Sequence, residues 1–178
     1  MIHKYLSYLY DLPVLDYFLI AAVGVAFWAG IAVLAENKKW WKPFNGVAFG
    51  LSAAAILLVT VVARNYSVVG YSMVPFASFS LAKTYTDVYS EVALNSILFL
   101  PLGLTLPYTA AGRAKHPVLL AIMASCAFSV LIEVCQYIFR LGFAEIDDVI
   151  FNTLGAAIGA CSYLLARLIP NKKAKGNG

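Results

Sequence analysis

The chain has 178 residues, of which 62% are hydrophobic and 12% are charged, and its formal net charge is +4. Soluble domains have about 45–50% apolar and about 25% charged residues, so a water-soluble core does not account for this composition. A membrane-spanning helix takes about 20 residues, and five of them with short connections use up the chain. The composition therefore predicts an all-α fold, a single polytopic bundle of transmembrane helices.

Five apolar runs are long enough to cross a bilayer. They are residues 17–35, 44–64, 91–109, 117–139 and 147–169. We expect 1–16 to be an interfacial segment, 17–170 a single transmembrane domain, and 171–178 a basic cytoplasmic tail. The long connection, 65–90, is apolar and aromatic. It is expected to lie in the interface, or to dip in where protein can satisfy its backbone.

The positions of lysine and arginine predict the orientation of the bundle. Five spans place nine basic residues on one side: Lys38, Lys39, Lys42, Arg113, Lys115, Arg167, Lys172, Lys173 and Lys175. Four fall on the other side: Lys4, Arg64, Lys83 and Arg140. Because cytoplasmic connections retain positive charge, the C-terminus is expected in the cytoplasm and the N-terminus outside.

The remaining composition argues against several partners and cofactors. There is no basic groove interleaved with stacking aromatics, so nucleic acid is not expected to bind. Cys126, Cys135 and Cys161 lie in apolar runs without CxxC spacing, and His3 and His116 are far apart. We therefore predict neither a metal site nor a cofactor. The oligomeric state is left open.

The fourth span carries a polar stripe. Ser129, Glu133, Gln136 and Arg140 recur at intervals of four, three and four residues, which places them on one helix face. Glu133 lies about 10 Å deeper than Arg140 at 1.5 Å per residue. An ionised carboxylate at such a depth costs about 2.5–3.5 kcal/mol unless it meets a partner or water. Glu133 is therefore expected to face the bundle, with Arg140 and Asp148 as candidate partners.

Two further spans carry a carboxylate and an amide in their outer halves. These residues are Glu91 and Asn95 in the third span and Asp148 and Asn152 in the fifth. Gly155 and Gly159 continue the stripe of the fifth span and form a small-xxx-small face that permits close helix packing. Together with Glu133, Gln136 and Arg140, the residues Asn95, Asp148 and Asn152 predict a polar cluster near the outer face. Glu91, Arg64 and Asp147 are candidates for its rim.

Most of these groups also have a structural interpretation. Amides in spans commonly join helices, at about 0.6 kcal/mol each. Asp147 and Asp148 can cap the start of the fifth helix, and Arg140 can snorkel to phosphate head groups. Glu133 is different, because a deep carboxylate is by default a functional-site hypothesis.

Acids, amides and one guanidinium suit three classes of function. They can bind the phosphate and sugar of a lipid head group. They can serve an intramembrane enzyme acting on a lipid-linked phosphate or ester, or relay protons in a transporter. No GxSxG, HExxH, SxxK or P-loop is present, so no recognised catalytic motif supports an enzyme. Few polar residues lie in the cytoplasmic halves of the spans, which disfavours transport.

Three ordered motifs resemble the VanZ-like membrane protein family. They are N-x3-F-x-P-x-G at 95–103, S-x3-E-x2-Q-x3-R at 129–140 and DDVxxNTLGxxxG at 147–159. With the segment Val74-Pro75-Phe76, the resemblance covers roughly 73–160. Ala156 stands where a second glycine is frequent, and Glu145 where an aspartate often precedes the acidic pair. Neither departure changes the charge of the cluster.

The resemblance implies a multi-pass protein of the bacterial cell envelope, in the inner or plasma membrane. The family is associated with low-level resistance to teicoplanin, without replacement of the cell-wall precursor terminus, and no molecular activity is attached to it. Because the motif residues coincide with the polar cluster, we expect that cluster to bind a lipid, a head group or a lipophilic antibiotic from the outer leaflet. Expected partners are membrane lipids and a lipid-linked precursor or lipoglycopeptide.

Overall fold

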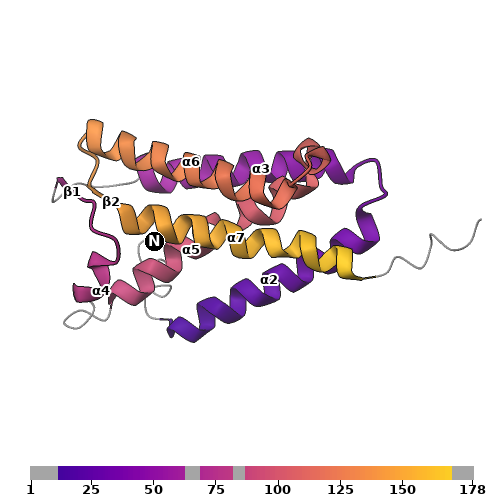
Figure 1. The fold of residues 1–178 in the computed structure, drawn as a ribbon, viewed down its shortest axis with the longest axis horizontal. Helices are drawn as coiled ribbons and strands as arrows, with labels where there is room; N and C mark the ends of the chain where they lie inside the picture. Colours follow the sequence, from indigo (N-terminus) through magenta and orange to yellow (C-terminus); the bar gives the residue numbers. More distant parts are fainter. Residues whose placement is uncertain (1–11, 63–68, 82–86, 170–178) are drawn as a thin grey trace, which may run out of the picture.

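Five long helices form the bundle in the computed structural model, which describes residues 12–62, 69–81 and 87–169 (Figure 1). All five are long and apolar enough to cross a membrane. They are α2 (Val14–Ala35), α3 (Trp41–Leu57) with a π-helical extension (Leu58–Val62), α5 (Asp87–Thr105), α6 (Pro117–Ile138) and α7 (Ile146–Leu168). The predicted all-α, five-span architecture is confirmed.

Helices α5 and α7 form the centre of the bundle. Helix α7 packs against α5, α6 and α2, and α5 also contacts α3 and α2 (Figure 1). Their backbones approach so closely that a Cβ added to Gly155 would lie 1.9 Å from the carbonyl oxygen of Ser96. A Cβ on Gly103 would lie 1.9 Å from the carbonyl oxygen of Ala156. Only glycine fits at these two positions, because no side-chain movement relieves a clash with backbone.

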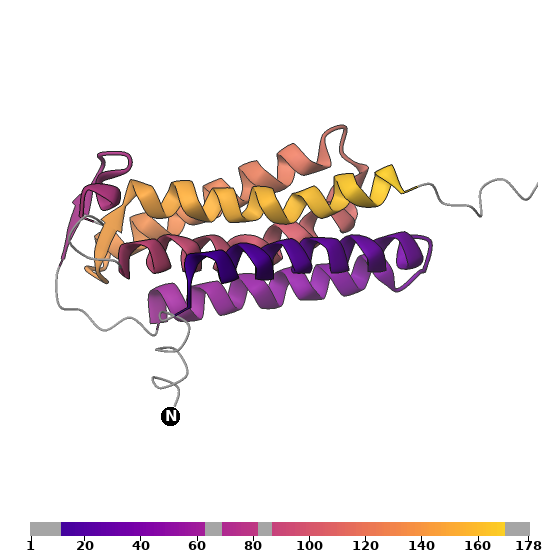
Figure 2. The same ribbon diagram turned by 90° about the horizontal axis from the view of Figure 1, so that it is seen from below.

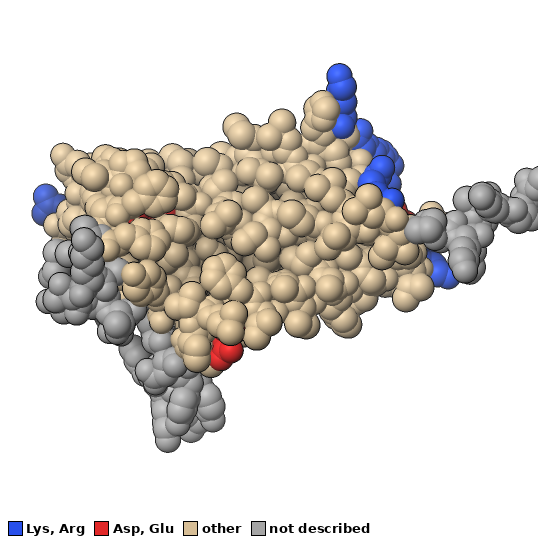
Figure 3. Space-filling model, turned by 60° about the horizontal axis from the view of Figure 1, so that its bottom comes forward, with Lys and Arg blue, Asp and Glu red and all other residues tan. Residues whose placement is uncertain are grey.

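The two ends of the bundle differ in character. Lysine and arginine side chains gather at the end where α7 finishes, and the flank of the face shown is largely uncharged (Figure 3). The opposite end carries two short strands and a short helix (Figure 2). We call these the basic end and the α4 end. Many large apolar side chains on the flank are exposed, as expected for surfaces that face lipid.

The described part of the long connection folds over the α4 end. Strand β1 (Gly70–Ser72) pairs in parallel with β2 (Phe143–Glu145), with Gly70 opposite Phe143. Helix α4 (Ala77–Leu81) follows. One carboxylate fixes this segment, because Asp147 accepts hydrogen bonds from the backbone N–H groups of Phe76 at 2.5 Å and Ser78 at 3.0 Å. Phe76 has a left-handed φ of 62°, which these contacts stabilise.

We predict that Gly155→Ala lowers the free energy of unfolding by at least about 1–3 kcal/mol, the usual cost of overpacking, because the new methyl group meets backbone of α5. Thermal unfolding in detergent micelles measures the change. Gly50→Ala is the control, since an added Cβ there meets no atom within 4 Å. In a helix interior alanine is favoured over glycine, so this control should be neutral or stabilising. Equal effects of the two substitutions would contradict the close contact.

Asp147→Asn is expected to release the described connection from the bundle, because the amide has one acceptor oxygen for two backbone donors. Loss of one charged hydrogen bond corresponds to about 1.5–3 kcal/mol. Hydrogen exchange should therefore accelerate in peptides covering 70–81. Asp16→Asn is the matched control, because the Asp16 carboxylate accepts no hydrogen bond from the described residues. Unchanged exchange in the Asp147 variant would show that the segment is held in another way.

Candidate functional site

Glu133 lies inside the bundle, one turn before the end of α6. Only 8% of its surface is exposed, as its burial cost predicted. Its Oε2 accepts a hydrogen bond of 3.0 Å from the backbone N–H of Glu145, at the junction of β2 and α7. This bond satisfies part of the buried carboxylate and ties the end of α6 to the start of α7.

A cavity of about 400 Å³ lies beside Glu133 at the α4 end. One wall is a stripe of α6, from Val130 to Ile138, and the other is formed by β2, the first turn of α7 and Met73. Apart from Glu133 and Glu145, the lining residues are apolar or aromatic. Tyr137 is 53% exposed and Ile138 is 64% exposed, so the cavity lies against the lipid-facing surface. It therefore offers an amphiphile an apolar space next to carboxylates.

Two amides of the motifs form hydrogen bonds between helices. Asn95 donates from α5 to Oδ1 of Asp148 at 2.6 Å. Asn152 donates from α7 to the hydroxyl of Ser129 on α6 at 2.8 Å. Neither amide lines the cavity. Their geometry is that of amides joining helices, the structural interpretation of these residues.

Gln136 joins α6 to the end of α3. Its side-chain N–H donates a hydrogen bond of 3.0 Å to the carbonyl of Thr60, within the π-helical segment. A π-helical turn leaves backbone carbonyls out of the regular α-helical pattern, so it can provide an acceptor to a neighbouring helix. Gln136 is 1% exposed and, like the other amides, does not line the cavity.

Arg140 differs from the rest of the stripe. It follows α6 in a left-handed conformation with a φ of 55°. The N–H of Leu141 bonds to the carbonyl of Gln136 at 2.7 Å, and the N–H of Arg140 to the carbonyl of Tyr137 at 3.3 Å. This is the Schellman motif, which usually uses glycine. The exposed guanidinium forms no hydrogen bond or ion pair with the described residues, so the predicted contact with Glu133 is not formed.

The predicted rim residues have different environments. Asp147 is 3% exposed and holds the connection, and Asp148 is half-buried beside Asn95. Both carboxylates lie in the first turn of α7, where negative charge is favourable, and both also bond to other elements. The N-cap residue is Glu145, whose side chain makes no capping hydrogen bond. Glu91 is exposed in the first turns of α5, and Arg64 lies outside the described residues.

The sequence analysis did not identify Glu145 and Met73 as cavity residues. Their only signal is position: Met73 follows the segment that pairs with β2, and Glu145 precedes the acidic pair. Within 12–62, 69–81 and 87–169, no three histidine, cysteine or acidic side chains are grouped as metal ligands would be.

The comparisons with known proteins agree with this architecture. A family model described as VanZ/LLP1 matches residues 20–167, which include all three motifs. Protein VanZ from Enterococcus faecium is 30% identical over 109 residues, 61% of this chain and 62% of that protein. The chain thus matches less than two thirds of that relative's length, and no solved structure matches it. Since the family match spans most of the chain and the helices are those of a multi-pass membrane protein, this chain belongs to the VanZ-like family.

Proposed function

We propose that the chain binds an amphiphile in the Glu133 cavity from the outer leaflet and thereby confers low-level resistance to teicoplanin-type glycopeptides. The observation that carries the proposal is the cavity itself, an apolar space of about 400 Å³ with a buried carboxylate in its wall. Ligand sites of this kind combine an apolar lining with a few polar groups that orient the ligand.

The lining indicates the chemistry of the ligand. Val130, Val134 and Ile138 offer contacts to an acyl chain or an aromatic ring. Glu133 and Glu145 offer acceptors, so they favour a ligand with an amine, amide or hydroxyl donor next to its apolar part. Teicoplanin-type drugs carry a lipid tail, and a lipid-linked precursor joins an apolar chain to hydroxyl-rich sugars.

A phosphate or other anionic group would bind elsewhere on the same ligand. The side-chain donors of Asn95, Gln136 and Asn152 are used within the bundle, and a carboxylate repels an anion. Arg140 is two residues beyond the cavity-lining Ile138 and has an exposed guanidinium. Its planar donors suit a phosphate or carboxylate at the mouth of the cavity.

The proposal requires the α4 end to face outward, and the charge distribution supports that orientation. Of the seven described lysines and arginines, six belong to the basic end: Lys38, Lys39, Lys42, Arg113, Lys115 and Arg167. The seventh, Arg140, follows α6 at the α4 end. Cytoplasmic connections keep positive charge, so the basic end is assigned to the cytoplasm of a bacterial cell.

Cysteine labelling tests this orientation. In a background without Cys126, Cys135 and Cys161, Arg140→Cys should react with a membrane-impermeant maleimide in intact cells. Lys115→Cys should react only after the membrane is opened. The reverse pattern would place the cavity in the inner leaflet and overturn access from outside.

Glu133→Gln is expected to remove protection against teicoplanin in a susceptible host at matched membrane levels of protein. The glutamine oxygen can still accept the hydrogen bond of Glu145, so the fold is kept while the charge is lost. Loss of one charged hydrogen bond, about 1.5–3 kcal/mol, should weaken drug binding to the purified protein about 10- to 100-fold. Asp16→Asn is the control, because it changes a carboxylate in the first turn of α2 that does not line the cavity.

A second variant tests the cavity without changing a charge. Val134→Phe fills the apolar space from a position that is 46% exposed, so it should reduce binding while the fold is kept. If the intact protein protects the host and both variants protect it equally well, resistance does not depend on the cavity. No protection by the intact protein would overturn the resistance role, and release of a product from purified protein with a lipid-linked substrate would favour an enzyme.

A further inference from the structure

A second pocket lies at the basic end, and none of its lining residues lines the Glu133 cavity. It has a volume of about 130 Å³ and a more polar lining than the Glu133 cavity. Residues from the α2–α3 turn, the segment after α5 and the end of α7 meet there. Its principal side chains are Glu36, Trp41, Lys42, Tyr108, Tyr163 and Arg167.

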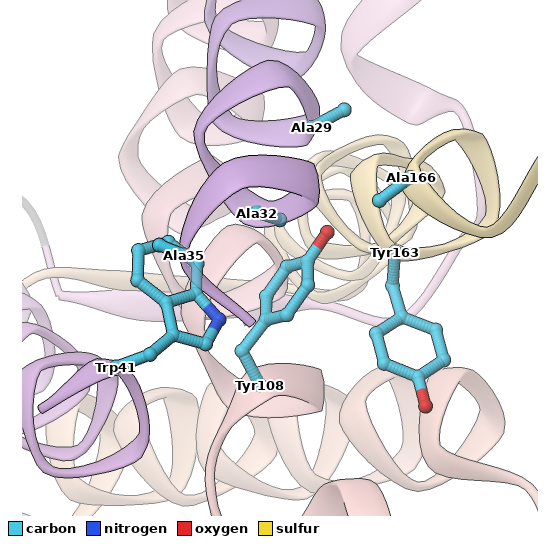
Figure 4. Close-up of a cluster of buried hydrophobic side chains, with 7 residues drawn as sticks. All are labelled: Ala29, Ala32, Ala35, Trp41, Tyr108, Tyr163 and Ala166. Carbon is cyan, nitrogen blue, oxygen red and sulfur yellow. The ribbon is translucent and has the colours of Figure 1, made fainter. Parts of the chain in front are cut away.

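Trp41 has a buried donor without an acceptor. Its side chain is 1% exposed, and its indole Nε1–H forms no hydrogen bond with the described residues. Figure 4 shows this nitrogen on the side of the ring that faces Tyr108, whose ring centroid is 5.5 Å away. An aromatic ring is a weak acceptor compared with an oxygen atom. A buried donor left in this state calls for an explanation, and a ligand oxygen in the pocket supplies one.

Arg167 is held in place at the wall of the same pocket. Its Nη2 donates to the hydroxyl of Tyr163 at 2.5 Å, and its guanidinium carbon lies 4.6 Å from the centre of that ring. Both contacts leave further guanidinium N–H groups for another acceptor. Lys42 adds a second positive charge and Glu36 one negative charge, so the lining has a net charge of +1.

We infer that this pocket binds the phosphate of an anionic phospholipid. An indole N–H, a guanidinium and an ammonium group all donate hydrogen bonds, and a phosphate offers several oxygen acceptors. A lipid fits better than a free phosphate ion, because the pocket lies at the ends of four membrane spans. Trp40 and Phe44 beside it are 52% and 45% exposed, and such aromatic side chains lie at the membrane interface.

Trp41→Phe tests the inference, because it keeps an aromatic ring and removes the N–H. The protein is purified in a neutral detergent and titrated with phosphatidylglycerol or phosphatidylcholine, with binding followed by native mass spectrometry. We expect the intact protein to prefer phosphatidylglycerol. Its affinity for this lipid should fall about tenfold in Trp41→Phe, because one hydrogen bond to a charged group is lost. Trp40→Phe is the matched control, since that indole is exposed, and it should bind as the intact protein does.

Stability in lipid-free detergent separates binding from a purely structural role. Trp41→Phe is expected to unfold earlier than the intact protein there, because the smaller ring leaves a cavity in the buried cluster around Trp41. Binding is therefore compared at a temperature at which both proteins remain folded. Equal binding of the two lipids by the intact protein, or unchanged binding by folded Trp41→Phe, would each overturn the inference. An equal loss of affinity for phosphatidylglycerol and phosphatidylcholine in Trp41→Phe would assign the effect to lost packing and would overturn it as well. Displacement of the lipid by millimolar inorganic phosphate would assign the pocket to the free ion. Drug protection through Glu133 is independent of all these outcomes.

Discussion

The close contact between α5 and α7 is the constraint on which the rest of the structure depends. Helices in a bilayer have no hydrophobic force driving them together, so their association relies on packing and interhelical hydrogen bonds. Without a side chain, Gly155 lets the backbone of α7 reach Ser96 on α5. That approach brings the Ser96 hydroxyl to within 3.1 Å of the Phe151 carbonyl, and it brings Asn95 to Asp148. Packing and polar contacts therefore fix the same register.

The position of α7 in turn organises the α4 end. Two motif carboxylates accept hydrogen bonds from backbone N–H groups near the start of α7. Glu133 on α6 accepts from Glu145, and Asp147 on α7 accepts from Phe76 and Ser78 in the connection. A carboxylate that accepts backbone N–H groups avoids much of the cost of burial. The end of α6 and the connection, which are far apart in sequence, are thus both joined to the start of α7 by carboxylate–backbone hydrogen bonds.

The sequence predicted what depends on composition and helical period, and failed where tertiary contact decides. Five apolar runs and the inward orientation of Glu133 follow from the cost of placing polar groups in lipid. The pairing of β1 with β2 and the bond from Gln136 to Thr60 have no local pattern, because their partners are 73 and 76 residues away. Arg140 was expected beside Glu133 on the α6 stripe, but the helix ends first, and its left-handed conformation directs the chain toward β2.

The motif residues therefore divide by what their polar atoms already contact. The amide donors of Asn95, Gln136 and Asn152 are used inside the bundle, and both oxygens of Asp147 accept backbone bonds. Glu133 reaches the cavity wall, and Arg140 keeps an unpaired guanidinium among the described residues in a conformation that favours glycine. Glycine would suit the left-handed φ at Arg140 better than arginine, so the backbone does not account for this residue. In the proposed function, an amphiphile bound between the two positions would use both charges.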